Sequence, residues 1–235
     1  ILLIHGWGAT RNFWRPIKSL EGFRLIIPDL RGHGESDRAK DYSRERIILD
    51  MYELVSGLGI RELSIIGHSL GGIIATKIAV AFPELKIRKL VLVATPPEFK
   101  VGTPKRILTA LMLYLFTPLM RKIFTPKTLH NPQPEILEFI WNESAKGSKK
   151  AYIKFLRAFD NASIVDDLDE IKAEKIAIIP SDDKIVPTEY QKKVYSELCD
   201  RTIIIENAGH NVMLENPEEF RKTLESILKT SGLSR

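Results

Sequence analysis

The sequence is poor in cysteine and in long apolar stretches. Cys199 is the only cysteine among the 235 residues, which excludes an intrachain disulfide. A free cysteine is usually a small buried hydrophobe, so we expect Cys199 to be structural. The longest nearly unbroken apolar run, residues 107–116, is far shorter than the roughly 20 residues that cross a bilayer, and Pro118 follows it. We therefore expect no membrane-spanning helix.

The N-terminus lacks the signs of a secretory signal. It has no basic stretch followed by an apolar segment and a small-residue cleavage site. Together with the single cysteine, this favours a cytoplasmic protein. The chain opens in the apolar run of residues 1–4 without an initiator methionine, which leaves open whether residues precede Ile1.

Histidines are also few. The sequence has five, and none forms an H-E-x-x-H pattern or another compact spacing of metal ligands, so we expect no catalytic metal. Four of them, His5, His33, His68 and His130, are interpreted as structural or surface residues. The fifth, His210, has a different context.

What the sequence does have is a regular alternation of two kinds of segment. Short β-rich runs alternate with amphipathic helical stretches, a pattern typical of α/β proteins with a mostly parallel sheet covered by helices on both faces. Between the second and third strands, apolar residues recur at helical spacing from Ile47 to Leu58. The strands are expected at residues 1–4, 24–27, 62–66, 90–94, 175–179 and 202–205.

One connection is much longer than the others. Some 80 residues separate the strands predicted at 90–94 and 175–179, far more than a crossover needs. Prolines divide this stretch into short helical pieces. We therefore predict a core of residues 1–98 and 161–235 with a helical lid inserted at 99–160. The lid would lie over the carboxyl ends of the strands, where open α/β sheets bind ligands.

One serine lies in a sequence pattern that implies a particular backbone turn. Residues 67–71 read G-H-S-L-G, which matches G-x-S-x-G with Ser69 at its centre. The pattern alone is weak, but here it follows the predicted strand at 62–66 and precedes a helical stretch at 72–82. In that context the glycines permit a tight, strained turn that exposes the serine hydroxyl. The sequence therefore predicts Ser69 as a nucleophile.

A serine nucleophile requires a base and an acid. The hydroxyl reacts poorly near neutral pH, so a histidine must take its proton and a carboxylate must fix the tautomer of that histidine. Asp183 follows the strand predicted at 175–179, and His210 follows the strand predicted at 202–205. Both loops lie at the same sheet edge as Ser69. The chain order predicts a catalytic triad of Ser69, Asp183 and His210.

The reaction also needs backbone donors for the oxyanion of a tetrahedral intermediate. Leu70 follows the nucleophile at the start of a helix, where its N–H group has no helical acceptor. The H-G-W-G loop at residues 5–8 follows the first strand and offers a second donor. We therefore predict an oxyanion hole formed by the backbone N–H groups of Leu70 and Trp7.

Several of these motifs together resemble a known family. The landmarks are H-G-W-G at 5–8, D-L-R-G-H-G-E-S at 29–36, G-H-S-L-G-G at 67–72, D-K-I-V-P at 183–187 and A-G-H at 208–210. They are similar to those of the α/β-hydrolase family and extend over nearly the whole chain. The resemblance implies the α/β-hydrolase fold, a serine hydrolase mechanism and no cofactor.

Within that family, a narrower resemblance concerns the substrate. The H-G-W-G loop followed by F-W at 13–14, the V-A-T-P-P segment at 93–97 and the length of the lid resemble pimeloyl-acyl-carrier-protein methyl ester esterases of biotin synthesis. The P-S-D-D sequence at 180–183 departs from the glycine-containing turn that is frequent in the family, so Asp182 competes with Asp183 as the acid. The family spacing, four residues before Pro187, favours Asp183.

The predicted lid has two features that bear on substrates. Its apolar residues Leu111, Leu115 and Phe116 either line a pocket for an acyl chain or bury a lid helix on the core. The lid also holds eleven lysines and arginines against four acids, an excess of seven positive charges, which leaves −2 for the rest because the whole chain carries +5. Lys149 and Lys150 belong to this basic set.

The uneven charge suggests a partner. A basic lid at the mouth of an active site would attract an acidic acyl carrier protein or an anionic substrate. A solvated basic face is the alternative, and we expect no binding of nucleic acid.

The leading hypothesis is a serine carboxylic-ester hydrolase that works through an acyl-enzyme, acting on a small ester or on a methyl ester carried by acyl carrier protein. The same fold and triad also serve thioesterases, carbon–carbon bond hydrolases and lyases. A ligand-binding protein without catalysis is a third class, and the complete triad counts against it.

Overall fold

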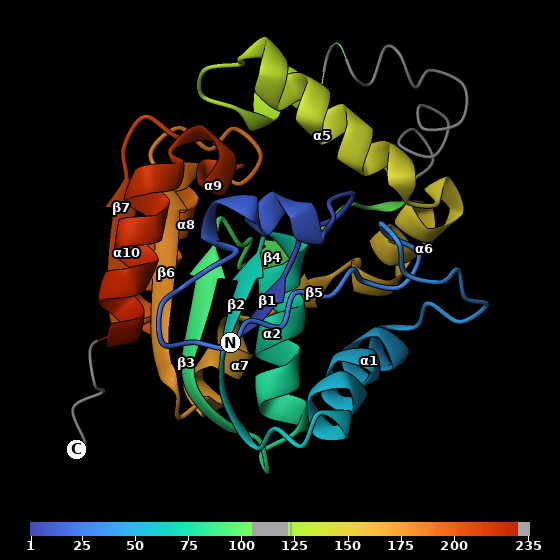
Figure 1. Ribbon diagram of the computed structural model, residues 1–235, viewed down its shortest axis with the longest axis vertical. Coiled ribbons are helices and arrows are strands. Elements are labelled where there is room, and N and C mark those ends of the chain that lie inside the picture. Colours follow the sequence, from blue (N-terminus) through green and yellow to red (C-terminus); the bar gives the residue numbers. More distant parts are fainter. Residues whose placement is uncertain (105–121, 123, 230–235) are drawn as a thin grey trace.

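A five-stranded parallel sheet forms the centre of the molecule (Figure 1). The computed structural model describes residues 1–104, 122 and 124–229. The strands are β1 (Leu2–Ile4), β2 (Glu62–His68), β3 (Lys86–Val93), β6 (Glu174–Pro180) and β7 (Arg201–Ile205), and they lie side by side in that order. Every neighbouring pair is parallel, as predicted. Each strand overlaps a segment predicted from the sequence.

The prediction of a strand at residues 24–27 is wrong except at one residue. Ile26 forms an isolated parallel bridge with Leu2. Its carbonyl accepts from the N–H of Leu3 at 2.9 Å, and its N–H donates to the carbonyl of Ile1 at 2.8 Å. Pro28 follows two residues later and has no N–H group to continue the pairing. Pairing at this edge therefore ends after one bridge.

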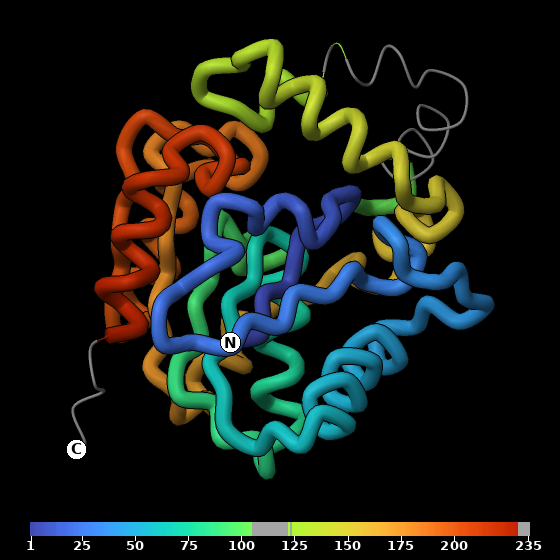
Figure 2. Tube along the Cα trace, viewed as in Figure 1, coloured from blue at the N-terminus to red at the C-terminus, as the bar shows by residue number. Residues whose placement is uncertain are grey.

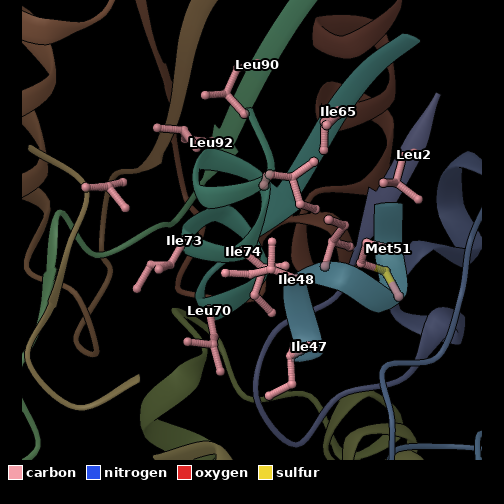
Figure 3. Packing of buried hydrophobic residues seen from close by; sticks show 14 of the residues in the cluster. Leu2, Ile47, Ile48, Met51, Ile65, Leu70, Ile73, Ile74, Leu90 and Leu92 are labelled. Atoms are coloured by element: carbon pink, nitrogen blue, oxygen red, sulfur yellow. The ribbon is translucent and has the colours of Figure 1, made fainter. Parts of the chain in front are cut away.

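Both faces of the sheet are buried because alternate side chains of each strand point to opposite sides. One face packs against α1 (Arg44–Gly57), α2 (Leu70–Ala81), α7 (Val165–Glu170) and α8 (Thr188–Leu198). Figure 3 shows this side, where Leu2, Ile65, Leu90 and Leu92 of the strands meet Ile47, Ile48, Met51, Ile73 and Ile74 of the helices. The opposite face is covered by the 3₁₀ helix η1 (Arg11–Ile17) and by α10 (Pro217–Lys229). The prediction of helices on both faces is confirmed.

Residues 99–160, predicted to form the lid and called the inserted segment below, begin and end at neighbouring points. β4 (Glu98–Phe99) and β5 (Ala162–Ser163) form a short antiparallel pair. Close by, Oδ1 of Asp160 accepts hydrogen bonds from the N–H groups of Val101 and Gly102, at 2.9 and 3.1 Å. These contacts hold the two ends of the segment together.

Within the inserted segment the structure describes the 3₁₀ helix η2 (Thr125–Thr128), α5 (Pro134–Lys146) and α6 (Lys149–Phe159). Figure 1 shows α5 beyond the carboxyl ends of the central strands. Residues 105–121 and 123 lie outside the described residues, and with them Leu111, Leu115 and Phe116. The division into a core and a lid stays a prediction.

A buried carboxylate fastens α5 to the N-terminal part of the core. Oε2 of Glu143 accepts from the Thr10 hydroxyl at 2.5 Å and from the Asn12 amide at 3.0 Å, and its Oε1 accepts from Lys146 at 2.6 Å. Burial raises the pKa of Glu143, but the hydrogen bonds from Lys146, Thr10 and Asn12 outweigh burial and lower it. Figure 2 shows the trace of α5 passing above that of η1.

None of the helices in the described ranges combines the length and the apolar content that crossing a bilayer requires. The cytoplasmic location stays a prediction. Cys199 is half-buried at the end of α8, and burial raises the pKa of its thiol to about 12. The thiol is therefore a poor nucleophile near neutral pH, as a structural cysteine should be.

Candidate active site

Ser69 lies at the turn between β2 and α2 in a strained backbone conformation. Its φ is 52° and its ψ is −122°, a region that residues with a side chain rarely adopt. Such strain costs on the order of 1–3 kcal/mol and persists where the surroundings enforce it. Here the N–H of Ser69 donates to the carbonyl of Val93 at 2.8 Å. A Cβ on Gly67 would clash with the backbone of Gly71, which explains why the turn needs glycine.

Ser69, His210 and Asp183 form a continuous row of hydrogen bonds. Nε2 of His210 lies 2.9 Å from Oγ of Ser69, and its Nδ1 lies 2.9 Å from Oδ2 of Asp183. In the neutral imidazole, Nδ1–H donates to the carboxylate, which leaves Nε2 free to accept the serine proton. The three predicted residues, which come from three separate loops, are thus brought together.

The carboxylate of Asp183 is buried and held in its charged form. Its Oδ1 accepts from the N–H groups of Ile185 and Val186, each at 2.9 Å. Burial raises the pKa of Asp183, but the charge and hydrogen bond of His210 and the two backbone donors outweigh burial and lower it. A charged acceptor is therefore in place to orient His210.

Two further residues hold Asp183, and sequence reasoning missed both. Nε2 of the fully buried Gln191 donates to Oδ2 of Asp183 at 3.2 Å and to the carbonyl of Val186 at 2.7 Å. The hydroxyl of Thr188 accepts from the N–H of Asp183 at 3.1 Å and donates to the carbonyl of Pro180 at 2.7 Å. No motif points to Gln191, which reaches Asp183 from the first half of α8.

Asp182, the competing candidate for the acid, has a different environment. Its side chain is 39% exposed and pairs with Lys184 at 3.1 Å and with His130 at 3.0 Å. Hydrogen bonds from Lys184 and His130 lower the pKa of Asp182. The geometry therefore selects Asp183 as the partner of His210.

Three other histidines lie beneath the site and are neutral near pH 7. Burial lowers the pKa of His5 to about 4 and that of His68 to about 3, and it holds the pKa of His33 well below its ordinary value. Nε2 of His5 accepts from the N–H of Leu30 at 3.0 Å, and Nε2 of His68 bonds to the carbonyl of His210 at 2.9 Å. These contacts are structural, as predicted for His5, His33 and His68.

The loop that follows β1 is fixed from two sides. The indole N–H of Trp7 donates to the carbonyl of Tyr152 on α6 at 2.8 Å, and the N–H of Gly8 donates to Nε2 of His33 at 3.3 Å. Leu70 is the first residue of α2, so its N–H has no acceptor within the helix. The oxyanion role of the Trp7 and Leu70 backbone groups stays a prediction.

Lys149 and Lys150 line a cavity of about 490 Å³ on the surface. The remaining lining residues are Arg38, Ala39, Tyr42, Gly147 and Ser148, and the three residues of the hydrogen-bonded row are not among them. A role of the two lysines in substrate binding stays a prediction. Over the described ranges, no three His, Cys, Asp or Glu side chains gather where they would hold a metal ion.

Comparison with known proteins agrees with the fold. The model of the alpha/beta hydrolase family matches residues 1–223. A pimeloyl-[acyl-carrier protein] methyl ester esterase of Wigglesworthia glossinidia brevipalpis is 29% identical over 97% of this chain and 93% of its own length. A bifunctional esterase/perhydrolase of Acinetobacter calcoaceticus is 25% identical over 98% of this chain and 91% of its own. An esterase from Exiguobacterium antarcticum shares the fold with a TM-score of 0.88, at 24% identity, over 97% of this chain and 91% of that one. The chain therefore belongs to the α/β hydrolase family.

Proposed function

We propose that this protein is a serine carboxylic-ester hydrolase that works through an acyl-enzyme. The observation that carries the proposal is the row of two 2.9 Å hydrogen bonds from Asp183 through His210 to Ser69, with the serine on a strained turn. Activated serine, oriented base and buried acid are the parts that acyl transfer requires. The esterase names of the two relatives point the same way.

In the first half of the reaction, Oγ of Ser69 attacks the ester carbonyl carbon while Nε2 of His210 takes the hydroxyl proton. The negative charge that develops on the carbonyl oxygen is stabilised by the N–H groups of Leu70 and Trp7. Collapse of this tetrahedral intermediate breaks the bond to the alcohol, which leaves with the proton from His210. The acyl group is then an ester of Ser69.

In the second half, water replaces the alcohol. Nε2 of His210 takes a proton from the water as its oxygen attacks the acyl carbon, and a second tetrahedral intermediate forms. Its collapse releases the carboxylic acid and returns the proton to Oγ of Ser69. Throughout, Asp183 stays charged and stabilises the imidazolium that forms in each half.

Replacement of Ser69 with Ala tests the proposal. We expect loss of turnover of a small ester such as p-nitrophenyl butyrate by several orders of magnitude, with an unchanged circular dichroism spectrum. A fluorophosphonate should label the wild-type protein and fail to label the variant. A variant that keeps wild-type turnover would contradict the proposal. Cleavage of a thioester or a diketone without ester turnover would favour another reaction of this family.

The narrower proposal names a methyl ester carried by acyl carrier protein as the substrate. It is supported by the name of the relative that is 29% identical and by the excess of seven positive charges in residues 99–160. Carrier proteins of this kind are acidic, so a basic surface would increase their rate of encounter, and salt would weaken the effect.

The test compares a carrier-bound pimeloyl methyl ester with a small free ester. Charge reversal at Lys149 and Lys150 should raise KM for the carrier-bound ester and leave the free ester unaffected. Lys193→Glu, an exposed lysine of α8 outside the inserted segment, is the control for the change of charge. Equal effects on both esters, or a salt-insensitive preference, would contradict the narrower proposal and leave a general carboxylesterase.

A further inference from the structure

The carboxylate of Glu215 accepts three backbone hydrogen bonds close to His210. Its Oε2 accepts from the N–H of Gly209 at 2.8 Å. Its Oε1 accepts from the N–H of His130 at 2.6 Å and from that of Asn131 at 3.1 Å. Glu215 is the last residue of the short helix α9 (Val212–Glu215). One side chain thus joins the loop that carries the proposed base to the inserted segment.

The same part of the inserted segment contacts the loops on both sides of the site. We name residues 128–131 the brace. The N–H of Asn211 donates to the carbonyl of Thr128 at 3.3 Å, and its Nδ2 donates to the Thr128 hydroxyl at 2.9 Å. Nδ1 of His130 lies 3.0 Å from Oδ2 of Asp182, which precedes the proposed acid. The brace therefore bonds to both the histidine loop and the acid loop.

The packing leaves little room for the histidine loop to move toward the brace. A Cβ placed on Gly209 would lie 2.6 Å from the backbone nitrogen of His130, so only glycine fits at this contact. Glu215 itself is half-buried. Burial raises its pKa, while the N–H groups of Asn131, Gly209 and His130 and the charge of His130 oppose the rise. Among the described residues on this side, Asp182 pairs with both Lys184 and His130.

We propose that Glu215 is a positioning residue that holds His210 in reach of Ser69 by tying the histidine loop to the brace. This inference rests on the proposed function, because it assigns Glu215 a part in the reaction of Ser69. Both carboxylate oxygens accept hydrogen bonds, Oε2 from the histidine loop and Oε1 from the brace. An amide of the same shape has only one acceptor oxygen and would direct its NH₂ group at an N–H donor. Glutamine should therefore fail as a substitute.

Glu215→Gln is the central test, and Glu219→Gln, an exposed residue on α10, is its control. The assay measures the rate of Ser69 phosphonylation by a fluorophosphonate and kcat for p-nitrophenyl butyrate, each per active site titrated. We expect Glu215→Gln to lower both rates roughly 10- to 100-fold at nearly constant KM, because small misplacements of a catalytic group have effects of this size. Glu219→Gln should match the wild type.

A second variant tests the proposal in case the Glu215→Gln protein does not fold. Thr128→Val removes the hydroxyl that accepts from Asn211 and leaves side-chain volume nearly unchanged. It should lower the per-site rates in the same direction by a smaller factor. Hydrogen exchange at the amides of Gly209, His130 and Asn131 supplies a readout without catalysis, and these amides should lose protection in Glu215→Gln.

The outcomes separate the two proposals. A wild-type protein that is neither labelled at Ser69 nor active on any ester would remove the proposed function itself. If the wild type is active and a folded Glu215→Gln variant has per-site rates within twofold of the wild type, only the positioning role of Glu215 is overturned. Loss of thermal stability in Glu215→Gln without a change in per-site rates has the same meaning, because it leaves Glu215 a structural residue only.

Discussion

Nε2 of His68 lies 2.9 Å from the carbonyl oxygen of His210, so the residue before Ser69 bonds directly to the backbone of its partner. Burial lowers the pKa of His68 to about 3, so the ring is neutral and Nε2–H is the donor. The nucleophile turn and the histidine loop, far apart in sequence, are thereby set at a fixed separation.

The ring of His68 lies edge-on to that of Trp14, with 6.5 Å between the ring centroids. Replacement of His68 with Phe should slow catalysis because it removes the donor and keeps a ring at this position. We expect kcat to fall roughly 10-fold with KM within twofold, since the loss displaces His210 and leaves its carbonyl unpaired. His68→Gln, which supplies an amide donor, should recover part of kcat. Steady-state kinetics on a small ester measures both variants. A His68→Phe variant with the kcat of the wild type would show that the donor has no role.

Gln191 should matter for the charge and the position of Asp183. Gln191→Leu removes a donor to a buried carboxylate, a change worth roughly 1.5–3 kcal/mol of stability. We expect a lower melting temperature and a several-fold lower kcat. Gln133, the only other glutamine and an exposed one, supplies the matched control Gln133→Leu. Should both variants melt and turn over alike, the hydrogen bond from Gln191 would be dispensable.

The buried histidines predict how stability depends on pH. The folded pKa of His5, about 4, and that of His68, about 3, lie below the ordinary value of 6.5. The unfolded chain therefore binds more protons as the pH falls below 6.5, and stability decreases toward pH 4. Between pH 7 and pH 4, each of the two histidines should lower the free energy of unfolding by on the order of 3 kcal/mol. Denaturant midpoints measured from pH 7 to pH 4 should fall steadily, and a constant midpoint would show that these rings are accessible to protons.

Glu143 should hold α5 on the core. Glu143→Ala leaves the buried hydroxyl of Thr10 and the amide of Asn12 without their shared acceptor, which costs roughly 2–3 kcal/mol. Glu138→Ala changes an exposed glutamate of the same helix and serves as the control. Thermal melting and hydrogen exchange along residues 134–146 measure the difference. Equal stability of the two variants would mean that apolar contacts alone hold α5.

Much of the fold followed from local patterns. The strands β2, β3 and β6 are apolar runs buried on both faces, so their positions were visible in the sequence. The start of β3 could not be predicted from the sequence. Its first residues include Lys86, Arg88 and Lys89, and charged residues are not typical of a buried strand. Lys89 is nonetheless buried and paired with Glu174. Only the finished sheet brings that partner alongside.

Of the residues in and around the site, some were predictable from the sequence and others were not. Ser69 and His210 stand in local motifs, and chain order narrowed the acid to Asp182 or Asp183. Gln191, Glu143 and Glu215 gave no such signal, because each acts through contacts with residues distant in the sequence. A buried polar residue of this kind is recognised by its partners, and these are known only once the chain is folded.

The most direct test of the account is to trap the acyl-enzyme. The protein is mixed with excess p-nitrophenyl butyrate, quenched in acid within milliseconds and measured by intact-protein and peptide mass spectrometry. For the wild type, the account predicts one butyryl group per chain, located on Ser69. The Ser69→Ala variant should carry no butyryl group. In a His210→Ala variant that has been acylated beforehand under forcing conditions, the butyryl group should persist. Ester turnover at the wild-type rate with no adduct on Ser69 would contradict it.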